Sequence, residues 1–447
     1  MSQENILGTE KISKLFVKYS LPAIVAMVIN GVQTIIDGIF LGNFVGPNAM
    51  ASVNLVQPFN QLIIGTSMII SIGCISFIGR TLGEGKKKEA QNIFKTSLIV
   101  MFLVSLIITF VGIIFNKNIA MILGANEVLL ESVSIYIKTL AIFSIPMSLM
   151  FLFGFVDRVI EKPELYLKGS IISVMTNIIL NYILIKKLQL GIRGAAIATG
   201  MSFSMALIIT ILPLLNKNSV INIFKGKFDK STIWPVVYNG SSEGVTAIAI
   251  ATTAFVFNMA FMQIAREIGI AAFTSISYIS QFGTLIMFGI SDGIGPIISY
   301  NYGYQKHDRV DDVLKISYKV TLLVGITLFA ILFLFGRSLV GIFAGSNKDV
   351  LEMAVNGSKL YAFAFFFNGF NIVYSGYFTA IGKAKESIII SACRGIVFII
   401  IGILVLPTIV NLKGVWLTVP FAELMTFIIG IRLMNKNSFV KDSKVAA

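Results

Sequence analysis

Long apolar stretches dominate the chain and recur from one end to the other. A helix that crosses the hydrocarbon core of a bilayer needs about 20 mostly apolar residues. Twelve windows of this kind are present, at about residues 19–44, 49–79, 93–115, 136–156, 165–185, 194–215, 233–262, 268–300, 316–335, 360–381, 388–410 and 414–434. Backbone groups in lipid must bond within their own segment, and these windows are too long for barrel strands. We therefore predict an all-α integral membrane protein with twelve transmembrane helices.

The composition excludes an ordinary water-soluble surface. Only 13% of the residues are charged, against about 25% in a soluble domain, and the mean hydropathy is +0.86. The net charge of +14 would suggest a nucleic-acid partner in a soluble protein. Here the basic residues lie between apolar windows, so membrane topology explains them and we expect no nucleic acid.

The distribution of basic residues predicts the orientation. Of the 36 Lys and Arg residues, 25 fall in one alternating set of segments, which includes both ends of the chain, and 10 fall in the other. The positive-inside rule then places both termini in the cytoplasm, as expected for a multi-pass protein of the plasma membrane. Lys186 and Lys187 are a local exception. The first window, 19–44, is too long for a signal-peptide core, so we expect it to be retained as a helix.

Matching residues recur at a nearly constant spacing, which indicates an internal repeat. At an offset of 223 residues, Gly46, Ala49, Ser52, Phe59, Leu62 and Ile63 match Gly269, Ala272, Ser275, Phe282, Leu285 and Ile286. At an offset of 221 residues, Gly124, Asn126, Leu130, Glu131, Lys138 and Lys162 match Gly345, Asn347, Leu351, Glu352, Lys359 and Lys383. The repeat predicts two six-helix lobes, residues 1–222 and 223–447. Because six is even, both lobes share one orientation and a pseudo-two-fold axis along the membrane normal is expected.

Asp37 is the most informative ionisable residue in the first half. A charged group at mid-membrane costs about 2.5–3.5 kcal/mol on insertion scales, so it needs a partner, a cavity or a function. Asn30, Gln33, Thr34 and Asp37 share one helix face, and we expect Asn30 and Gln33 to line the substrate cavity. The functional interpretation is a carboxylate that binds H⁺ or Na⁺, and the alternative is an Asp capped at a helix end.

Two further polar stripes accompany this face. In the fifth window Ser170, Ser173, Asn177 and Asn181 lie on one face, and their side chains either complete a cation site with Asp37 or bond between helices. In the second window Asn54, Gln57 and Gln61 suit the lining of a substrate cavity or packing.

The second half places one basic and several acidic residues inside its windows. Arg394 could pair with Glu423 or with Glu243, either to hold helices in register or to take part in coupling. Asp292, between Ser291 and Gly293, could simply face water.

Catalytic and metal-ligand patterns are not evident. Cys74 and Cys393 lie in apolar stretches, and His307 is the only histidine. These residues build neither a metal-ligand cluster nor a disulfide framework. We therefore expect a transporter rather than an enzyme, without a cofactor.

Several segments, in their order along the chain, resemble the multidrug and toxic compound extrusion (MATE) family, and within it the Gram-positive drug exporters. The resemblance covers about residues 11–434. Its carriers are Asp37–Gly42 (DGIFLG), Gly83–Ala90 (GEGKKKEA), Gly194–Thr199 (GAAIAT), Asn239–Glu243 (NGSSE), Pro296–Gly303 (PIISYNYG), and Gly414–Pro420 (GVWLTVP) followed by Glu423.

The resemblance implies two six-helix lobes around a central cavity, and export of amphipathic, often cationic drugs in exchange for H⁺ or Na⁺. Asp37 matches the family's helix 1 aspartate that takes part in coupling, and Asn177 matches a polar helix 5 position. Asn181 stands where many members carry Asp. Glu243 matches an acidic helix 7 position, so a Na⁺ ion could bind at Asp37 or at Glu243. Where some members have a helix 10 Asp, this chain offers Asn368 and Asn371, which we expect in the substrate cavity.

Three other functions fit the sequence less well than drug export. A flippase for lipid-linked oligosaccharides, from the same superfamily, would need a strongly cationic cavity, whereas Arg394 is the only basic residue deep in a window. An integral membrane enzyme would need a cluster of His, Cys or acidic residues at one membrane face. A channel fits the repeat poorly, because no pore-loop signature is present. We expect a monomer in membrane lipid with small-molecule drugs as substrates.

Overall fold

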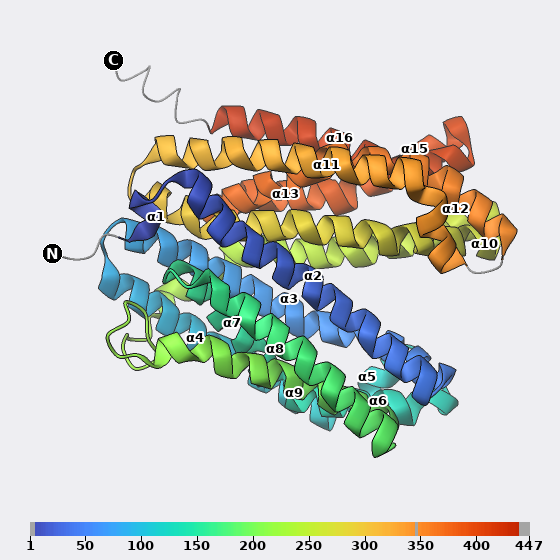
Figure 1. The fold of residues 1–447 in the computed structure, drawn as a ribbon, viewed down its shortest axis with the longest axis horizontal. Coiled ribbons are helices and arrows are strands. Elements are labelled where there is room, and N and C mark those ends of the chain that lie inside the picture. Colours follow the sequence, from blue (N-terminus) through green and yellow to red (C-terminus); the bar gives the residue numbers. More distant parts are fainter. Residues whose placement is uncertain (1–4, 345–346, 438–447) are drawn as a thin grey trace. The chain divides into compact units, whose positions relative to one another are not determined.

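The computed structural model describes residues 5–344 and 347–437, and its regular elements within those ranges are all helical. In chain order they are α1 Ile6–Thr9, α2 Ile12–Phe44, α3 Pro47–Gly83, α4 Lys87–Ile114, α5 Asn116–Ile122, α6 Glu127–Ile142, α7 Ser144–Val159, α8 Pro163–Asn181, α9 Gly191–Ile211, α10 Ile233–Gly303, α11 His307–Ala344, α12 Lys348–Tyr361, α13 Phe365–Ala380, α14 Ala384–Ala392, α15 Phe398–Val410 and α16 Leu412–Lys436 (Figure 1). Short π-helical segments at Tyr182–Lys187 and Cys393–Val397 continue α8 and join α14 to α15.

The long helices account for the twelve predicted windows. In the described ranges nine helical segments are long and apolar enough to span a membrane, and the bent pair α6 and α7 makes a tenth span. The 71-residue α10 contains two windows, and non-helical backbone at Arg266 (φ 53°, ψ −147°) interrupts it between them. The shorter α13 covers most of the window at 360–381. The prediction of a twelve-helix membrane protein is therefore confirmed.

Large apolar side chains lie on the outside of these helices. Ile107 of α4 is 61% exposed, and Leu323 and Leu334 of α11 are 65% and 70% exposed. A water-facing helix would carry polar residues at such positions. The exposed apolar faces are therefore the surface that lipid covers.

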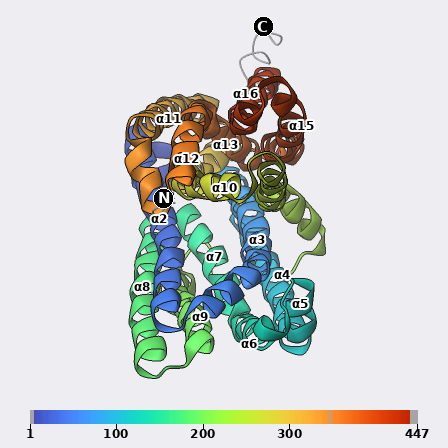
Figure 2. The same cartoon turned by 90° about the vertical axis from the view of Figure 1, so that its right-hand side faces the viewer.

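The chain divides into two compact units. The first lobe comprises Met1–Glu10 and Leu21–Gly240, and the second lobe comprises Lys11–Ser20 and Ser241–Ala447. Within the first lobe α8 packs along α9, and within the second α15 packs along α16, as the view along the helices shows (Figure 2).

The division at Gly240 lies beyond the boundary expected at residue 222, because the intervening segment packs on the first lobe. The Gln91 side chain donates to the carbonyl of Asn222 at 2.7 Å, and Lys95 Nζ donates to the carbonyl of Ile223 at 3.0 Å. At Gly240 the backbone passes so close to α3 that a Cβ would lie 1.8 Å from the carbonyl oxygen of Ile69. These contacts tie residues 222–240 to α3 and α4.

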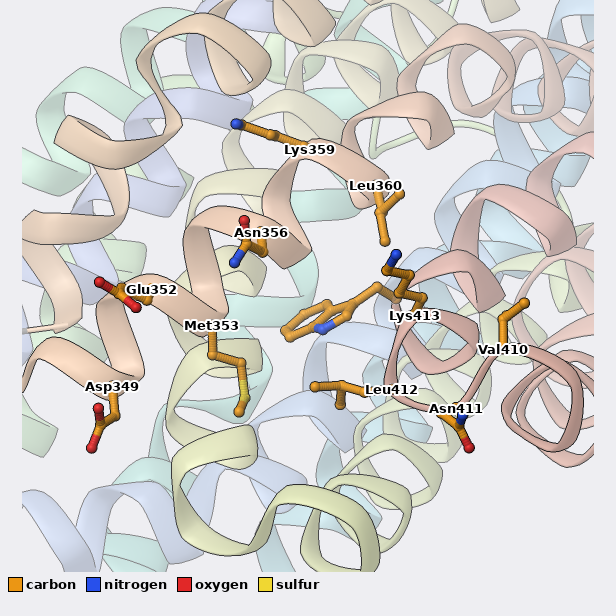
Figure 3. Close-up of a pocket in the computed structure, with 11 residues that line it drawn as sticks. Asp349, Glu352, Met353, Asn356, Lys359, Leu360, Val410, Asn411, Leu412 and Lys413 are labelled. Carbon is orange, nitrogen blue, oxygen red and sulfur yellow. The ribbon is translucent and has the colours of Figure 1, made fainter.

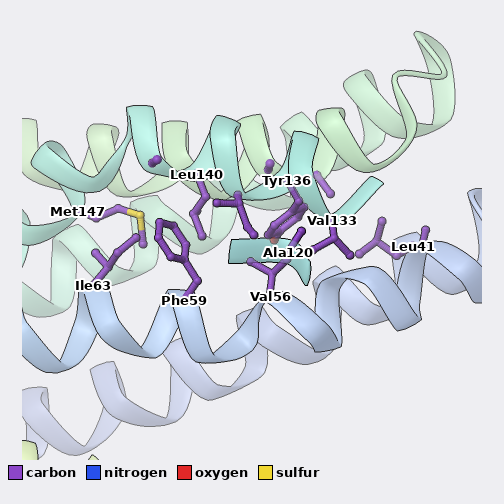
Figure 4. Packing of buried hydrophobic residues seen from close by; sticks show 14 of the residues in the cluster. Leu41, Val56, Phe59, Ile63, Ala120, Val133, Tyr136, Leu140 and Met147 are labelled. Carbon is purple, nitrogen blue, oxygen red and sulfur yellow. The ribbon is translucent and has the colours of Figure 1, made fainter. Parts of the chain in front are cut away.

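Each lobe has its own apolar core. In the first lobe, Phe59 and Ile63 of α3 point toward Leu140 and Met147 (Figure 4). In the second lobe the core is aromatic: Phe257 stacks on Phe273 at 4.6 Å between ring centroids, and Trp416 lies 4.6 Å from Phe261. These cores fix the helices that carry the polar side chains described next.

Candidate functional site

Asp37 is the centre of a polar cluster inside the first lobe. Asn177 Nδ2 and Asn181 Nδ2 both donate to Oδ1 of Asp37, at 2.9 and 2.7 Å. Thr199 Oγ1 donates to Oδ2 at 3.3 Å. The two Asn side chains also bond to each other, from Asn181 Nδ2 to Asn177 Oδ1 at 3.1 Å. We call these four residues the Asp37 cluster.

A second layer of polar contacts continues one helical turn away. Gln33 precedes Asp37 by four residues on α2, and its Nε2 donates to Ser202 Oγ at 3.2 Å. Ser173 Oγ donates to Gln33 Oε1 at 3.3 Å. Residues four apart lie on the same face of a helix, so α2 meets α8 and α9 along one continuous polar seam.

The charge of Asp37 meets only neutral partners in this cluster. Asn177 and Asn181 are fully buried, and Asp37 is partly exposed. Among the described residues no Lys or Arg forms an ion pair with the carboxylate of Asp37. Oδ1 of Asn181 is buried and accepts no hydrogen bond from a described residue. Two amide groups and a hydroxyl therefore donate to the carboxylate, and its negative charge is left for a small cation to balance.

A second cluster lies inside the second lobe around Glu423, which is 3% exposed. Asn368 Nδ2 donates to Glu423 Oε1 at 2.8 Å, and Asn371 Nδ2 donates to Oε2 at 2.7 Å. Arg394 Nε forms an ion pair with Oε1, also at 2.8 Å. Of the two partners that the sequence allowed for Arg394, the structure pairs it with Glu423. We call these four residues the Glu423 cluster.

A π-helical segment accompanies each cluster. One begins directly after Asn181, and the other contains Arg394. A π-bulge shifts the side chains that follow it around the helix axis, and such bulges occur frequently at functional sites. Both clusters therefore stand where the helical register changes.

Glu243 stands apart from these hydrogen-bonded clusters. Its side chain is partly exposed and has no hydrogen bond or ion pair with another described residue, although it lies within electrostatic range of Asp292 and Arg394. Among the described residues, no group of three or more His, Cys, Asp and Glu side chains could hold a metal ion.

Other predicted residues lie outside the clusters. On α2, Asn30 is partly exposed and Thr34 exposed, and on α3 Asn54 is exposed and Gln57 partly exposed. Asn54 and Gln57 make no hydrogen bond with another described residue, so they remain candidates for cavity lining. Asn368 and Asn371, expected in the substrate cavity, are instead buried against Glu423 in the structure.

Sequence reasoning did not single out three residues that the structure makes prominent. Thr199 and Ser202 are three residues apart on α9, but small polar residues are common packing residues in membrane helices. Asp157 lies one residue beyond the window at 136–156. It is fully buried, and neither of its carboxylate oxygens has a hydrogen-bond partner among the described residues.

A pocket of about 1100 Å³ opens elsewhere in the second lobe, between α12 and the junction of α15 with α16 (Figure 3). Asp349 and Glu352 lie on one side of it, and Lys413 lies on the other. The lining includes none of the predicted site residues. The Asp37 cluster and the Glu423 cluster are therefore the candidate functional sites.

Known proteins resemble this chain over almost its whole length. The MatE family model matches residues 22–183 and 244–404. The multidrug export protein MepA of Staphylococcus aureus (strain MSSA476) is 25% identical over 427 residues, which cover 95% of this chain and 94% of that protein. MepA of Staphylococcus saprophyticus is 26% identical over 404 residues, 89% of each chain.

Solved structures share the fold. An outward-facing multidrug resistance MATE family transporter of the MOP superfamily superposes with a TM-score of 0.91 at 20% identity, over 98% of each chain. A MOP superfamily transporter from Pyrococcus furiosus gives a TM-score of 0.90 at 20% identity, also over 98% of each chain. At 20% identity these structures support the fold alone. The chemistry of the site is inferred from the Asp37 cluster and the Glu423 cluster.

Proposed function

Because the chain belongs to the MatE family, as the resemblance in its sequence predicted, we propose that it is a secondary transporter that expels drugs in exchange for a small cation. Its substrates would be amphipathic, often cationic compounds, and the exchanged cation would be H⁺ or Na⁺. The relatives that match over most of its length are multidrug export proteins, which supports this substrate class. The single observation that carries the proposal is the carboxylate of Asp37, held by neutral donors and by no basic partner among the described residues.

The Asp37 cluster has the chemistry that cation exchange requires. An ionised carboxylate inside a low-dielectric bundle is unfavourable without a compensating positive charge. A proton would neutralise Asp37 directly. A Na⁺ ion would be held by oxygen atoms of Asp37 and Thr199, and by the unpartnered Oδ1 of Asn181 once that amide, which now donates to Asp37, turns its oxygen toward the site. In either case binding of the cation changes the charge of the site by one.

That change of charge can drive transport only if it discriminates between conformations. A ligand shifts a conformational equilibrium only by its difference in affinity for the two states. We propose that the cation binds more tightly when the transporter is open to the outside, where the drug leaves. If the cycle moves net charge, the membrane potential adds about 2.3 kcal/mol per charge per 100 mV.

Glu243 is the alternative coupling position. It has no hydrogen-bond or ion-pair partner among the described residues, and its neighbours Asp292 and Arg394 bear opposite charges. A cation at Glu243 would also relieve an unpaired charge. The two positions are separated experimentally by substituting each one alone.

The distribution of the basic residues supports one orientation of the chain in the membrane. We propose that the protein works as a monomer in the lipid of the plasma membrane, with both termini in the cytoplasm. This places the turn between α3 and α4, with Lys86, and the start of α4, with Lys87 and Lys88, on the cytoplasmic side.

The proposal is tested by dye efflux from cells that express single variants. Asp37→Asn is expected to abolish efflux of an organic-cation dye while the protein still reaches the membrane, because the amide cannot bind an exchangeable cation. Glu243→Gln is made in parallel to test the alternative position. Asp349→Asn, at an exposed acid in the second lobe, is the matched control and should transport normally. Full efflux by both Asp37→Asn and Glu243→Gln would refute the mechanism.

A further inference from the structure

The two lobes hold their buried carboxylates in a similar way. Each carboxylate receives hydrogen bonds from two Asn side chains of one helix: Asn177 and Asn181 in the first lobe, Asn368 and Asn371 in the second. Each cluster also lies beside a π-helical segment. The neutral parts of the two sites are therefore closely alike.

The clusters differ in how their charge is balanced. Asp37 has Thr199, a neutral hydroxyl, as its third donor, at 3.3 Å. Glu423 has Arg394 instead, with Nε 2.8 Å from Oε1. Arginine is the side chain that serves as a permanent cation in buried ion pairs, and the guanidinium of Arg394 is covalently tethered to its helix.

We propose that Arg394 is a built-in counter-cation, which occupies at Glu423 the place that an exchangeable cation takes at Asp37. The Glu423 cluster then keeps a constant charge throughout the cycle, and coupling is confined to carboxylates that lack such a partner. This inference rests on the proposed function, because it removes Glu423 from the carboxylates that can bind the transported cation.

The burial of the pair supports a permanent partnership. The side chains of Arg394 and Glu423 are 18% and 4% exposed, so separating them would leave an uncompensated charge in a low-dielectric interior. The Arg394 guanidinium also lies 5.8 Å from the ring centroid of Phe288, a cation–π distance. With Arg394 and the two Asn donors in place, both carboxylate oxygens of Glu423 accept hydrogen bonds from the chain and its charge is balanced, although Oδ1 of Asn368 and Oδ1 of Asn371, like that of Asn181, accept none from a described residue.

Other titratable groups face the pair and must be separated from it experimentally. Tyr361 is within electrostatic range of both Glu423 and Arg394, and its hydroxyl lies 3.2 Å from Ser280 Oγ. Glu243 is within range of Arg394, and Asp292 is within range of Glu243. Removal of Arg394 could therefore change the charge state of Glu243 as well as that of Glu423.

The test measures how many cations are exchanged per drug molecule, from the drug gradient that just balances an imposed cation gradient in proteoliposomes. Arg394→Gln leaves Glu423 with neutral donors only, like Asp37, and the number exchanged is expected to rise by about one. Arg394→Lys keeps a cation and should retain the wild-type number. The double variant Arg394→Gln/Glu423→Gln should also retain it, because a buried pair replaced by neutral groups of similar shape is usually tolerated.

One further variant makes the outcomes decisive. Arg394→Gln/Glu243→Gln should still exchange about one cation more than Glu243→Gln alone, which identifies Glu423 rather than Glu243 as the source of the added cation. If the single variant does not fold, the double variant with Glu423→Gln still decides, since loss of cation coupling in that variant would overturn the inference. An unchanged number in folded Arg394→Gln would overturn it too. Failure of the wild-type protein to respond to any cation gradient would instead refute the proposed function.

Discussion

At the scale of single residues, Thr199 can reveal the identity of the coupling cation. Its hydroxyl donates to Asp37 Oδ2 and so stabilises the ionised carboxylate, and the same oxygen could also be a ligand of Na⁺. Loss of the hydroxyl therefore has opposite consequences for the two candidate cations.

We predict that Thr199→Ala shifts the cation dependence of efflux, by about tenfold or more for one hydrogen bond to a charged group. If the cation is H⁺, half-maximal efflux moves to lower proton concentration, since the carboxylate binds the proton more tightly. If the cation is Na⁺, half-maximal efflux moves to higher Na⁺ concentration. Initial rates of dye efflux measure the shift, and Thr199→Ser should restore wild-type behaviour. Identical curves for Thr199→Ala and the wild type would argue against a cation at this site.

Glu161 has a strained backbone conformation, which a comparison with the equivalent position in the second lobe makes apparent. It follows α7 with φ +71°, whereas Gly382, 221 residues later, has φ +82° after α13. Both helices close with the same backbone bond, Lys162 N to Asp157 O and Lys383 N to Phe378 O, each at 2.8 Å. This left-handed position after a helix normally takes glycine. The second lobe thus has the favoured residue, and the first has a strained one.

Glu161→Gly is predicted to be more stable than Glu161→Ala by about 1 kcal/mol, because only glycine adopts this conformation without strain. Both variants lose the same hydrogen bond from Ile6 N to Glu161 Oε1, at 2.9 Å, so the comparison isolates the backbone effect. Thermal unfolding of the purified protein in detergent measures the difference. Gly382→Ala should be destabilised in the same assay, and equal melting temperatures for the two Glu161 variants would contradict the explanation.

At the scale of elements, the start of α10 is fixed by its close approach to α3. A Cβ at Gly240 would lie 1.8 Å from the Ile69 carbonyl oxygen, and one at Gly73 would lie 2.0 Å from the Val236 carbonyl oxygen. Both contacts involve backbone, which cannot move aside as a flexible side chain could. Glycine at these two positions is therefore a packing requirement.

Gly240→Ala should sharply reduce the yield of folded protein, since the overpacking exceeds the usual cost of about 1–3 kcal/mol for an inserted methylene. Gly295→Ala, on the same helix, meets no atom within 4 Å and is the matched control. Size-exclusion profiles of the two variants in detergent make the comparison. A normal monodisperse peak for Gly240→Ala would show that α3 and α10 lie farther apart.

The sequence predicted the elements better than their partnerships. Apolar windows located the spans, and the interval between the windows at 233–262 and 268–300 contains the break at Arg266. Helical periodicity predicted that Asn177 and Asn181 share one helix face, and the charge of Asp37 indicated which face of α2 would contact them. Thr199 had no comparable signal in the sequence, because a single hydroxyl group resembles the many small polar residues that only pack between membrane helices. The choice of Glu423 over Glu243 for Arg394 depends on how α16 packs, which periodicity does not encode.

At the scale of the whole molecule, the lobes share an architecture but differ in the charge of their buried sites. The first lobe holds a carboxylate with no basic ion-pair partner among the described residues, and the second holds a closed ion pair. Duplication supplied two similar sets of helices, and one added cation, Arg394, separates their electrostatic properties. Exchange with solution is accordingly assigned to a carboxylate that has no such internal counter-charge.

The most direct test of this account is cation release from the purified wild-type protein when an organic-cation drug is added in detergent, without any gradient. Competition between drug and cation predicts release of about one cation per drug bound, and Asp37→Asn should release none while remaining folded. Release is followed with a pH indicator in weak buffer and with a Na⁺ electrode. Undiminished release from Asp37→Asn would contradict the assignment of the exchanged cation to this carboxylate.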